Sequence, residues 1–247
     1  MLYWLLKLFG IGPLLRLFYS PWAQGIENVP LTGPAIMASN HVSFSDSFFL
    51  GVVLKRRITY LAKSDYFTGR GFKGALSRAF FSGVGQVPID RTGGSASQAA
   101  LKAGLSVLDK GQLLGIYPEG TRSPDGKLYR GKTGVARLAL ISKAPVIPVA
   151  MVGTFDVQPE GRVIPKIGDV GSIIGKPLDF SRYEGLENDP LVLRAVTDEI
   201  MYELMKLGSQ EYVDVYAADV KKRLKQESDD LDDEFGLAIG EFEGALS

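Results

Sequence analysis

Residues 34–54 read PAIMASNHVSFSDSFFLGVVL, and this stretch decides the fold class. The apolar run at 34–39 has the length of a buried strand, a polar segment follows it, and a second apolar run at 46–54 is long enough for a short helix. A strand, a loop and a helix in this order form the repeating unit of an α/β sheet. The stretch therefore predicts an α/β protein.

The same alternation continues along the 247 residues and predicts a single α/β domain with a central mixed sheet flanked by helices. The predicted strands cover 34–39, 58–62, 113–117, 146–152 and 171–175. The predicted helices cover 46–54, 71–81, 95–110, 133–143, 190–207 and 211–225. We expect an N-terminal membrane-associated segment at 1–25, the domain at 26–226 and an acidic, flexible tail at 227–247.

The net charge of zero hides an asymmetry along the chain. Eight of the 28 acidic residues follow Lys225, where there is no Lys or Arg, so the preceding part has a basic surplus of eight. A basic body suits an anionic membrane surface or phosphorylated ligands, although ordinary soluble domains often carry a similar surplus. The chain has no basic stripe or known nucleic-acid-binding module, so we expect no nucleic acid partner.

The composition also limits the chemistry of any site. The chain has no cysteine, which removes disulfides, thiolate metal ligands and cysteine nucleophiles, and fits a reducing compartment. It has one histidine and no clustered carboxylates outside the tail, so no metal site is expected.

The first twenty residues, MLYWLLKLFGIGPLLRLFYS, raise the question of a membrane segment. The apolar run has barely the ~20 residues that a bilayer span needs, and Lys7, Arg16 and a break at 12–13 interrupt it. It also lacks the basic start and the cleavage site of a secretory signal. We expect a kinked helix lying in the membrane interface with its aromatic rings at headgroup depth. The alternative is an apolar helix packed onto the domain.

His41 is the only histidine and lies in the polar segment 40–46, NHVSFSD. On one continuous helix, five residues turn a side chain by roughly 500°, so His41 and Asp46 would point apart. If His41 lies in the loop and Asp46 opens the helix, the carboxylate can hold one ring nitrogen and leave the other free to take a proton. The alternative is a structural histidine beside a helix-capping aspartate.

A second polar motif, EGTR at 119–122, follows the predicted strand 113–117. Gly120 permits a tight bend, Arg122 offers a planar donor fork for phosphate, and Glu119 can orient that fork or a neighbouring group. By itself the motif could equally be a surface ion pair. Ligands collect beyond the carboxyl ends of strands in open α/β sheets, so this motif and the histidine segment could face one cleft.

Two further basic residues follow short apolar stretches. Lys63 comes after the predicted strand 58–62, and Arg91 ends the segment VPIDR at 87–91. Each residue singly is more often a solvated charge than a ligand group. Together with Arg122 they could surround one dianion.

Four ordered blocks carry a resemblance to a known family. They are NHxSxxD at 40–46, VPIDR at 87–91, EGTR at 119–122 and VIPV at 146–149. In this order and spacing they resemble the glycerolipid acyltransferase family, and especially its bacterial, actinobacterial-like 1-acylglycerol-3-phosphate (lysophosphatidic acid) acyltransferases. The resemblance covers about residues 35–150. Tyr117 stands where the family often has phenylalanine before Pro-Glu-Gly, a change that affects no expected catalytic group.

The resemblance implies a reaction and a set of site residues. His41 would deprotonate the acceptor hydroxyl, Asp46 would orient it, and the alkoxide would attack a thioester directly without an acyl-enzyme. The implied donor is acyl-CoA or acyl-carrier protein, the acceptor is lysophosphatidic acid, the product is phosphatidic acid, and no cofactor is needed. The implied phosphate-binding residues are Arg91, Glu119, Gly120, Thr121, Arg122 and Lys63, with Asn40 and Lys132 as auxiliary candidates. The expected location is the cytoplasmic face of a bacterial plasma membrane, and the oligomeric state is left open.

Other interpretations are weaker or concern the acceptor. A serine hydrolase is disfavoured because the chain has no Gly-x-Ser-x-Gly elbow. The segment GKLYRGKT at 126–133 matches the phosphate-loop pattern but does not directly follow a strand, which disfavours nucleotide hydrolysis. The same acyl transfer could act on glycerol 3-phosphate, another lysophospholipid or a glycolipid. A lipid-binding protein without turnover is a further alternative.

Overall fold

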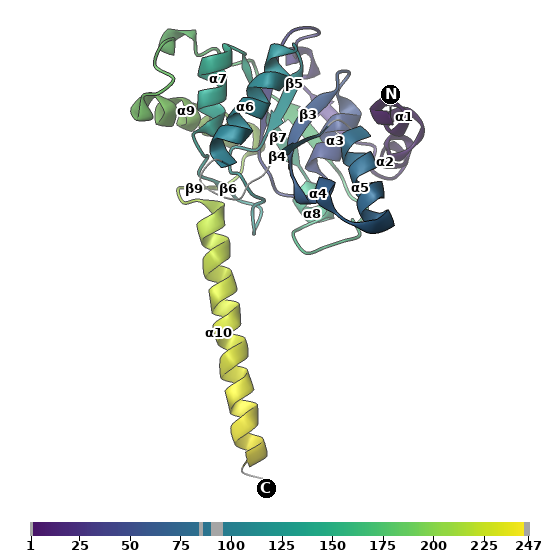
Figure 1. Cartoon of the computed structure of the whole chain (residues 1–247), viewed down its shortest axis with the longest axis vertical. Helices are drawn as coiled ribbons and strands as arrows, with labels where there is room; N and C mark the ends of the chain where they lie inside the picture. Colours follow the sequence, from purple (N-terminus) through teal and green to yellow (C-terminus); the bar gives the residue numbers. More distant parts are fainter. Residues whose placement is uncertain (1, 84–85, 90–95, 245–247) are drawn as a thin grey trace.

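The computed structural model describes residues 2–83, 86–89 and 96–244 (Figure 1). Its core is a seven-stranded sheet with the order β1-β8-β7-β2-β5-β3-β4. The strands are β1 (Trp22–Gln24), β2 (Ala35–Ser39), β3 (Ile58–Lys63), β4 (Val87–Ile89), β5 (Leu113–Ile116), β7 (Val146–Val152) and β8 (Gly171–Ile174). Paired strands are parallel except β7 and β8, which are antiparallel. The predicted mixed sheet is confirmed.

Helices cover both faces of the sheet (Figure 1). The described helices are α1 (Leu2–Phe9), α2 (Ile11–Tyr19), α3 (Asp46–Val53), α4 (Asp65–Thr68), α5 (Gly71–Gly83), α6 (Ala96–Asp109), α7 (Gly134–Ser142), α8 (Thr154–Val157), α9 (Pro190–Gly208) and α10 (Ala217–Gly244). Helix α10 covers neither face and projects away from the sheet (Figure 1). One layer contains α6, α7 and α9, and the opposite layer contains α3 with the N-terminal helices against it. A separate parallel pair, β6 (Leu128–Tyr129) and β9 (Tyr212–Val213), lies just before α10.

The central strand β2 contributes to both hydrophobic cores. Ile36 and Ala38 belong to the cluster with α6, α7 and α9, whereas Ala35 and Met37 belong to the cluster with α3. Successive side chains of a strand point to opposite faces, so a parallel strand covered on both sides consists of apolar residues throughout. This is the physical reason why the apolar run at 34–39 correctly predicted a buried strand.

Most predicted elements agree with the structure, and the largest difference lies near the C-terminus. All five predicted strands are present, but the three-residue strands β1 and β4 were not predicted. The helix predicted at 211–225 begins instead at Ala217, because Tyr212 and Val213 pair with β6. It continues to Gly244, so most of the expected flexible tail is helical. The segment contains no proline, and its Glu, Leu and Ala residues favour helix despite the aspartates.

The N-terminal segment forms two helices, and its break lies at Gly10 instead of 12–13. Pro13 lies in the first turn of α2, where its missing N–H would have had no helical acceptor. Gly12 lies against the backbone of the last turns of α1. A Cβ atom at Gly12 would be 1.8 Å from the carbonyl oxygen of Lys7.

Two cations attach the N-terminal helices to the domain. Lys7 Nζ donates a hydrogen bond to the carbonyl of Leu54, and Arg16 donates to the carbonyl of Val52 at 3.2 Å. Carbonyl groups at the C-terminal end of a helix lack helical partners and attract cations, and here that helix is α3. Other side chains of the pair point outward, with Phe9 81% and Leu17 75% exposed. The pair therefore packs onto the domain by one side and leaves an apolar outer side uncovered.

Gly115→Ala tests how tightly the sheet is packed below its carboxyl edge. Gly115 of β5 is paired with Tyr60 of β3, and a Cβ atom there would lie 2.3 Å from Cε1 of the Tyr60 ring. We expect this substitution to lower the free energy of unfolding by roughly 1–3 kcal/mol in urea titrations. Gly134→Ala is the control because nothing lies within 4 Å of its added Cβ atom. Equal stability of the two variants would contradict the packing argument.

Candidate active site

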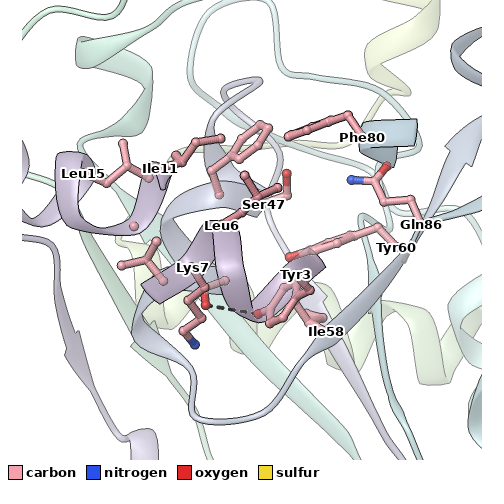
Figure 2. Close-up of a pocket in the computed structure, with 14 residues that line it drawn as sticks. Tyr3, Leu6, Lys7, Ile11, Leu15, Ser47, Ile58, Tyr60, Phe80 and Gln86 are labelled. Atoms are coloured by element: carbon pink, nitrogen blue, oxygen red, sulfur yellow. Dashed lines mark hydrogen bonds between the residues drawn. The ribbon is translucent and has the colours of Figure 1, made fainter. Parts of the chain in front are cut away.

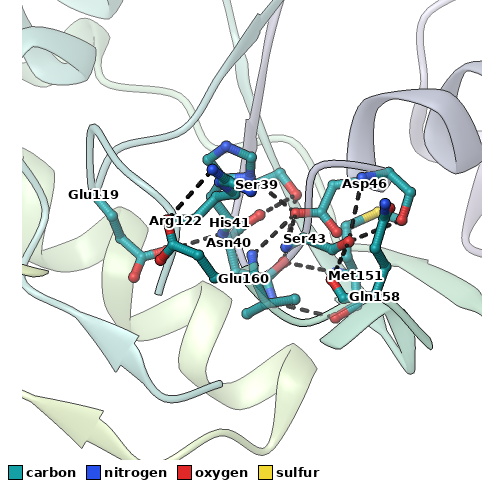
Figure 3. A network of polar contacts seen from close by, with 12 residues as sticks. Ser39, Asn40, His41, Ser43, Asp46, Glu119, Arg122, Met151, Gln158 and Glu160 are labelled. Carbon is teal, nitrogen blue, oxygen red and sulfur yellow. Dashed lines mark hydrogen bonds and ion pairs between the residues drawn. The ribbon is translucent and has the colours of Figure 1, made fainter. Parts of the chain in front are cut away.

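The two predicted polar motifs follow adjacent parallel strands. His41 comes after β2 and the EGTR motif after β5, and Ala38 of β2 is paired with Ile116 of β5. The next residue of the second segment, Ser123, donates its N–H to the carbonyl of His41 at 2.6 Å. The two segments therefore lie side by side beyond the carboxyl ends of the strands, as predicted (Figure 3).

His41 and Asp46 form the centre of this site. His41 Nδ1 lies 2.9 Å from Asp46 Oδ2, which also accepts hydrogen bonds from the backbone N–H groups of Val42 and Ser43 at 3.0 and 2.9 Å. Helix α3 begins at Asp46 and His41 lies in the preceding loop, so the geometry expected from the five-residue spacing is confirmed. Nε2 of His41 has no hydrogen-bond partner among the described residues and is the nitrogen available for a substrate.

Two tyrosines support the imidazole ring. His41 stacks on Tyr117 with 3.8 Å between ring centroids and 10° between planes, and Tyr117 stacks on Tyr60 at 5.5 Å. Burial raises the pKa of both tyrosines, so both rings are uncharged phenols. The stack limits rotation of the imidazole around its Asp46 contact. Nothing in the sequence spacing of Tyr117 indicated this role.

Glu119 has a different place from the one predicted. It was expected among the phosphate ligands, but its side chain is fully buried. Oε1 accepts from the N–H of His41 and Oε2 from the N–H of Tyr129, both at 2.9 Å. Burial raises the pKa of Glu119 to about 8, and these two hydrogen bonds oppose that shift. Glu119 therefore positions the backbone of His41, and its buried carboxyl oxygens are not accessible to a ligand.

The rest of the EGTR motif reaches the surface. Gly120 has φ = 76°, a left-handed conformation that glycine adopts without strain. The side chain of Lys132 lies against it, since a Cβ atom on Gly120 would be 3.2 Å from Lys132 Nζ. Arg122 lies 3.3 Å from Glu160, and Thr121 Oγ1 lies 3.4 Å from Lys221 Nζ. No sequence motif indicated Glu160 or Lys221, which come from distant segments.

Of the remaining predicted site residues, Asn40 and Lys63 lie within the described part of the chain and Arg91 does not. Asn40 is buried, and its amide oxygen and nitrogen bind the N–H and carbonyl of Met151 at 2.7 and 3.1 Å. It thus joins the ends of β2 and β7 instead of facing a ligand. Lys63 ends β3, and Arg91 lies outside the described residues. Within the described ranges, no group of three or more His, Asp or Glu side chains is placed to hold a metal ion.

A small apolar cavity of about 70 Å³, partly open to solvent, lies between the N-terminal helices and the domain (Figure 2). Leu6, Ile11 and Leu15 line it from α1 and α2, and Phe48 and Tyr60 line it from α3 and β3. Tyr60 is the outer member of the stack under His41, so one end of the lining lies near the histidine.

The acyltransferase family model matches residues 22–152, which is more than half of the chain. The match includes the strands from β1 to β7, the His41–Asp46 pair and the EGTR motif. The chain belongs to the acyltransferase family.

Three relatives show which members of the family the chain is similar to. A chloroplastic 1-acyl-sn-glycerol-3-phosphate acyltransferase of Brassica napus is 34% identical over 67% of this chain and 47% of its own length. The enzyme of that name from Bacillus subtilis is 30% identical over 74% of this chain and 86% of its own. The crystal structure of the 1-acyl-sn-glycerophosphate (LPA) acyltransferase PlsC from Thermotoga maritima superposes with a TM-score of 0.63 and 26% identity, covering 83% of this chain and 79% of that one. The chain spans about half the length of the plant relatives it matches.

Glu119→Gln tests the positioning contact. The amide nitrogen of glutamine cannot accept a hydrogen bond, so it would face the N–H of either His41 or Tyr129 in a buried site. We expect a loss of roughly 1–3 kcal/mol in the free energy of unfolding. Glu227→Gln makes the same substitution at an exposed position of α10 and should leave stability unchanged. A Glu119→Gln protein as stable as the Glu227→Gln protein would contradict this role.

Proposed function

We propose that the chain transfers a fatty acyl group from acyl-CoA or acyl-carrier protein to the free hydroxyl of 1-acylglycerol 3-phosphate, giving phosphatidic acid. The observation that carries the proposal is the His41–Asp46 pair, 2.9 Å apart, held beside an exposed arginine loop. A base with one nitrogen fixed and one free suits deprotonation of a hydroxyl. The arginine beside it suits a phosphorylated acceptor. The names of the relatives from Brassica and Bacillus support this acceptor.

In this mechanism Nε2 of His41 takes the proton of the acceptor hydroxyl as its oxygen attacks the thioester carbonyl. Asp46, hydrogen-bonded to Nδ1, stabilises the imidazolium that forms. The tetrahedral intermediate then expels the thiolate, which takes the proton back from Nε2, and the new ester leaves. The reaction needs no acyl-enzyme, metal or prosthetic group.

The acceptor phosphate binds the surface part of the EGTR motif in this proposal. The guanidinium of Arg122 provides paired donors for two phosphate oxygens. Ser123 fixes this arginine relative to His41 through its 2.6 Å hydrogen bond to the histidine carbonyl. Fixing the phosphate holds the hydroxyl within reach of the base, and such positioning is worth several kcal/mol of barrier. The apolar lining of the cavity beside Tyr60 suits contact with part of an acyl chain.

The activity is tested by release of free thiol from palmitoyl-CoA in detergent, with lipid products followed by mass spectrometry. We expect release that depends on lysophosphatidic acid and yields phosphatidic acid. Parallel reactions with glycerol 3-phosphate, other lysophospholipids and monoacylglycerol separate the alternative acceptors, and acyl-carrier protein separates the donors. Release without any acceptor would identify a thioesterase and refute the proposal.

Asp46→Asn tests the dyad while preserving the loop. The asparagine oxygen can still accept from the N–H groups of Val42 and Ser43, but it cannot neutralise an imidazolium. We expect kcat to fall by roughly 10²–10⁴ with the melting temperature little changed. His41→Ala should abolish transfer, and wild-type turnover in either variant would refute the mechanism.

The proposed location is the cytoplasmic face of a bacterial plasma membrane, with α1 and α2 lying in the interface. Residues 2–19 are long and apolar enough to span a bilayer by length and composition. They form helices of eight and nine residues, however, each far shorter than the ~20 residues of a span. Lys7 and Arg16 bind carbonyls of the domain, which leaves Phe9 and Leu17 on an apolar outer side. This arrangement favours shallow insertion over crossing.

Phe9→Glu combined with Leu17→Glu tests membrane attachment. Burial of a large apolar side chain contributes about 1.5–3 kcal/mol, so the double variant should lose at least tenfold in partitioning to vesicles that contain phosphatidylglycerol. Cosedimentation measures this. Leu191→Glu is the control, because Leu191 is also 81% exposed but lies on α9 in the opposite layer. Equal partitioning of the two proteins would contradict attachment by α1 and α2.

A further inference from the structure

Two cations and one carboxylate meet beside the EGTR motif (Figure 3 shows the Arg122–Glu160 pair). Oε1 of Glu160 lies 3.3 Å from a guanidinium nitrogen of Arg122, and Oε2 pairs with the ammonium of Lys221. The same ammonium lies 3.4 Å from Oγ1 of Thr121. The three charged side chains are 25–35% exposed, so a soluble anion can reach them.

The fold holds Lys221 in this place through the small sheet. Leu128 and Tyr129 of β6 pair with Tyr212 and Val213 of β9, and the N–H of Arg130 donates to the carbonyls of Val213 and Val215. Helix α10 then begins at Ala217, which is fully buried, and Lys221 follows one turn later. Because Tyr129 also donates to Glu119, the position of Lys221 is linked to the backbone that carries His41.

Glu160 reaches the cluster from the loop that follows α8. The carbonyl of Gln158 accepts a hydrogen bond from Ser43 Oγ at 2.8 Å, which attaches the start of this loop to the His41–Asp46 segment. Gly161 follows Glu160 with φ = 86°, so the chain turns directly after the carboxylate. The segment that carries His41 and Asp46 therefore holds the loop of Glu160 in place, and the EGTR motif itself does not.

We propose that Lys221 binds the acceptor phosphate together with Arg122, and that Glu160 occupies the phosphate position until the acceptor displaces it. The inference rests on the proposed function. Partly exposed ion pairs are weak, so the carboxylate is held loosely. A phosphate monoester has nearly twice the negative charge of the Glu160 carboxylate and has three terminal oxygens. It can therefore accept from the Arg122 fork, the Lys221 ammonium and the Thr121 hydroxyl together. Lys221 and Glu160 then set how well phosphorylated acceptors bind.

Kinetics of the full-length protein in detergent test this assignment. Lys221→Ala should raise KM for lysophosphatidic acid roughly tenfold or more, with kcat and KM for palmitoyl-CoA little changed. Lys222→Ala is the matched control, because Lys222 is the exposed next residue of the same helix. Lys221→Arg keeps the charge and should restore most of the affinity. An effect confined to KM for palmitoyl-CoA would assign the site to the donor and overturn the proposal.

Glu160→Gln tests the displaced carboxylate. It keeps the size of the side chain and removes its charge, so KM for lysophosphatidic acid should fall. A rise in KM would mean that Glu160 holds Arg122 and Lys221 in place for the acceptor, and would overturn the displacement. When monoacylglycerol, which has no phosphate, is the acceptor, its KM should be the same for all of these variants and for wild type.

Binding of glycerol 3-phosphate separates this inference from the proposed reaction. We expect it to raise the melting temperature of wild type and Lys222→Ala, but to require at least tenfold higher concentration for Lys221→Ala. If wild type transfers no acyl group but this difference persists, the proposed function fails and the phosphate site stands. If Lys221→Ala and Lys222→Ala behave alike in both assays, the inference fails even when the enzyme is active.

Discussion

The buried carboxylate of Glu119 is the contact on which the site depends. One oxygen holds the backbone of His41 and the other holds the backbone of Tyr129, so the loop after β2 and the segment after β5 cannot move independently. Burial raises the pKa of this carboxyl to about 8 even though the two N–H donors lower it, which shows how unfavourable a charge is at this buried position. Leaving such a group without a partner is costly, so the contact specifies one arrangement of the loops.

The same constraint extends to the C-terminal part of the chain. Tyr129 belongs to β6, which pairs with β9, and β9 leads into α10. Residues near 119 and residues near 221, about a hundred positions apart, thereby meet at one surface. A small two-stranded pairing outside the main sheet thus decides which lysine can join the arginine of the EGTR motif.

Helix α3 connects the histidine site with the N-terminal helices. Asp46 begins the helix and holds His41, while Lys7 and Arg16 bind carbonyls at its other end. Both contacts use groups at helix ends that lack helical partners, so neither disturbs the helix between them. In the proposed function this holds the base at one end of α3 and the membrane-attached helices at the other.

Much of this was determined by the sequence alone. Apolar runs at 34–39, 113–117 and 146–152 specify buried parallel strands because such strands must be apolar on both faces. The spacing of His41 and Asp46 likewise indicates that they can pair only if His41 lies in a loop and Asp46 begins a helix. The tertiary structure alone decided that Glu119 turns inward, that Tyr117 supports the imidazole and that Lys221 stands beside Thr121. Local periodicity reports which faces of an element are apolar, whereas these contacts depend on how distant segments pack, and a single glutamate, tyrosine or lysine carries no mark of its partner.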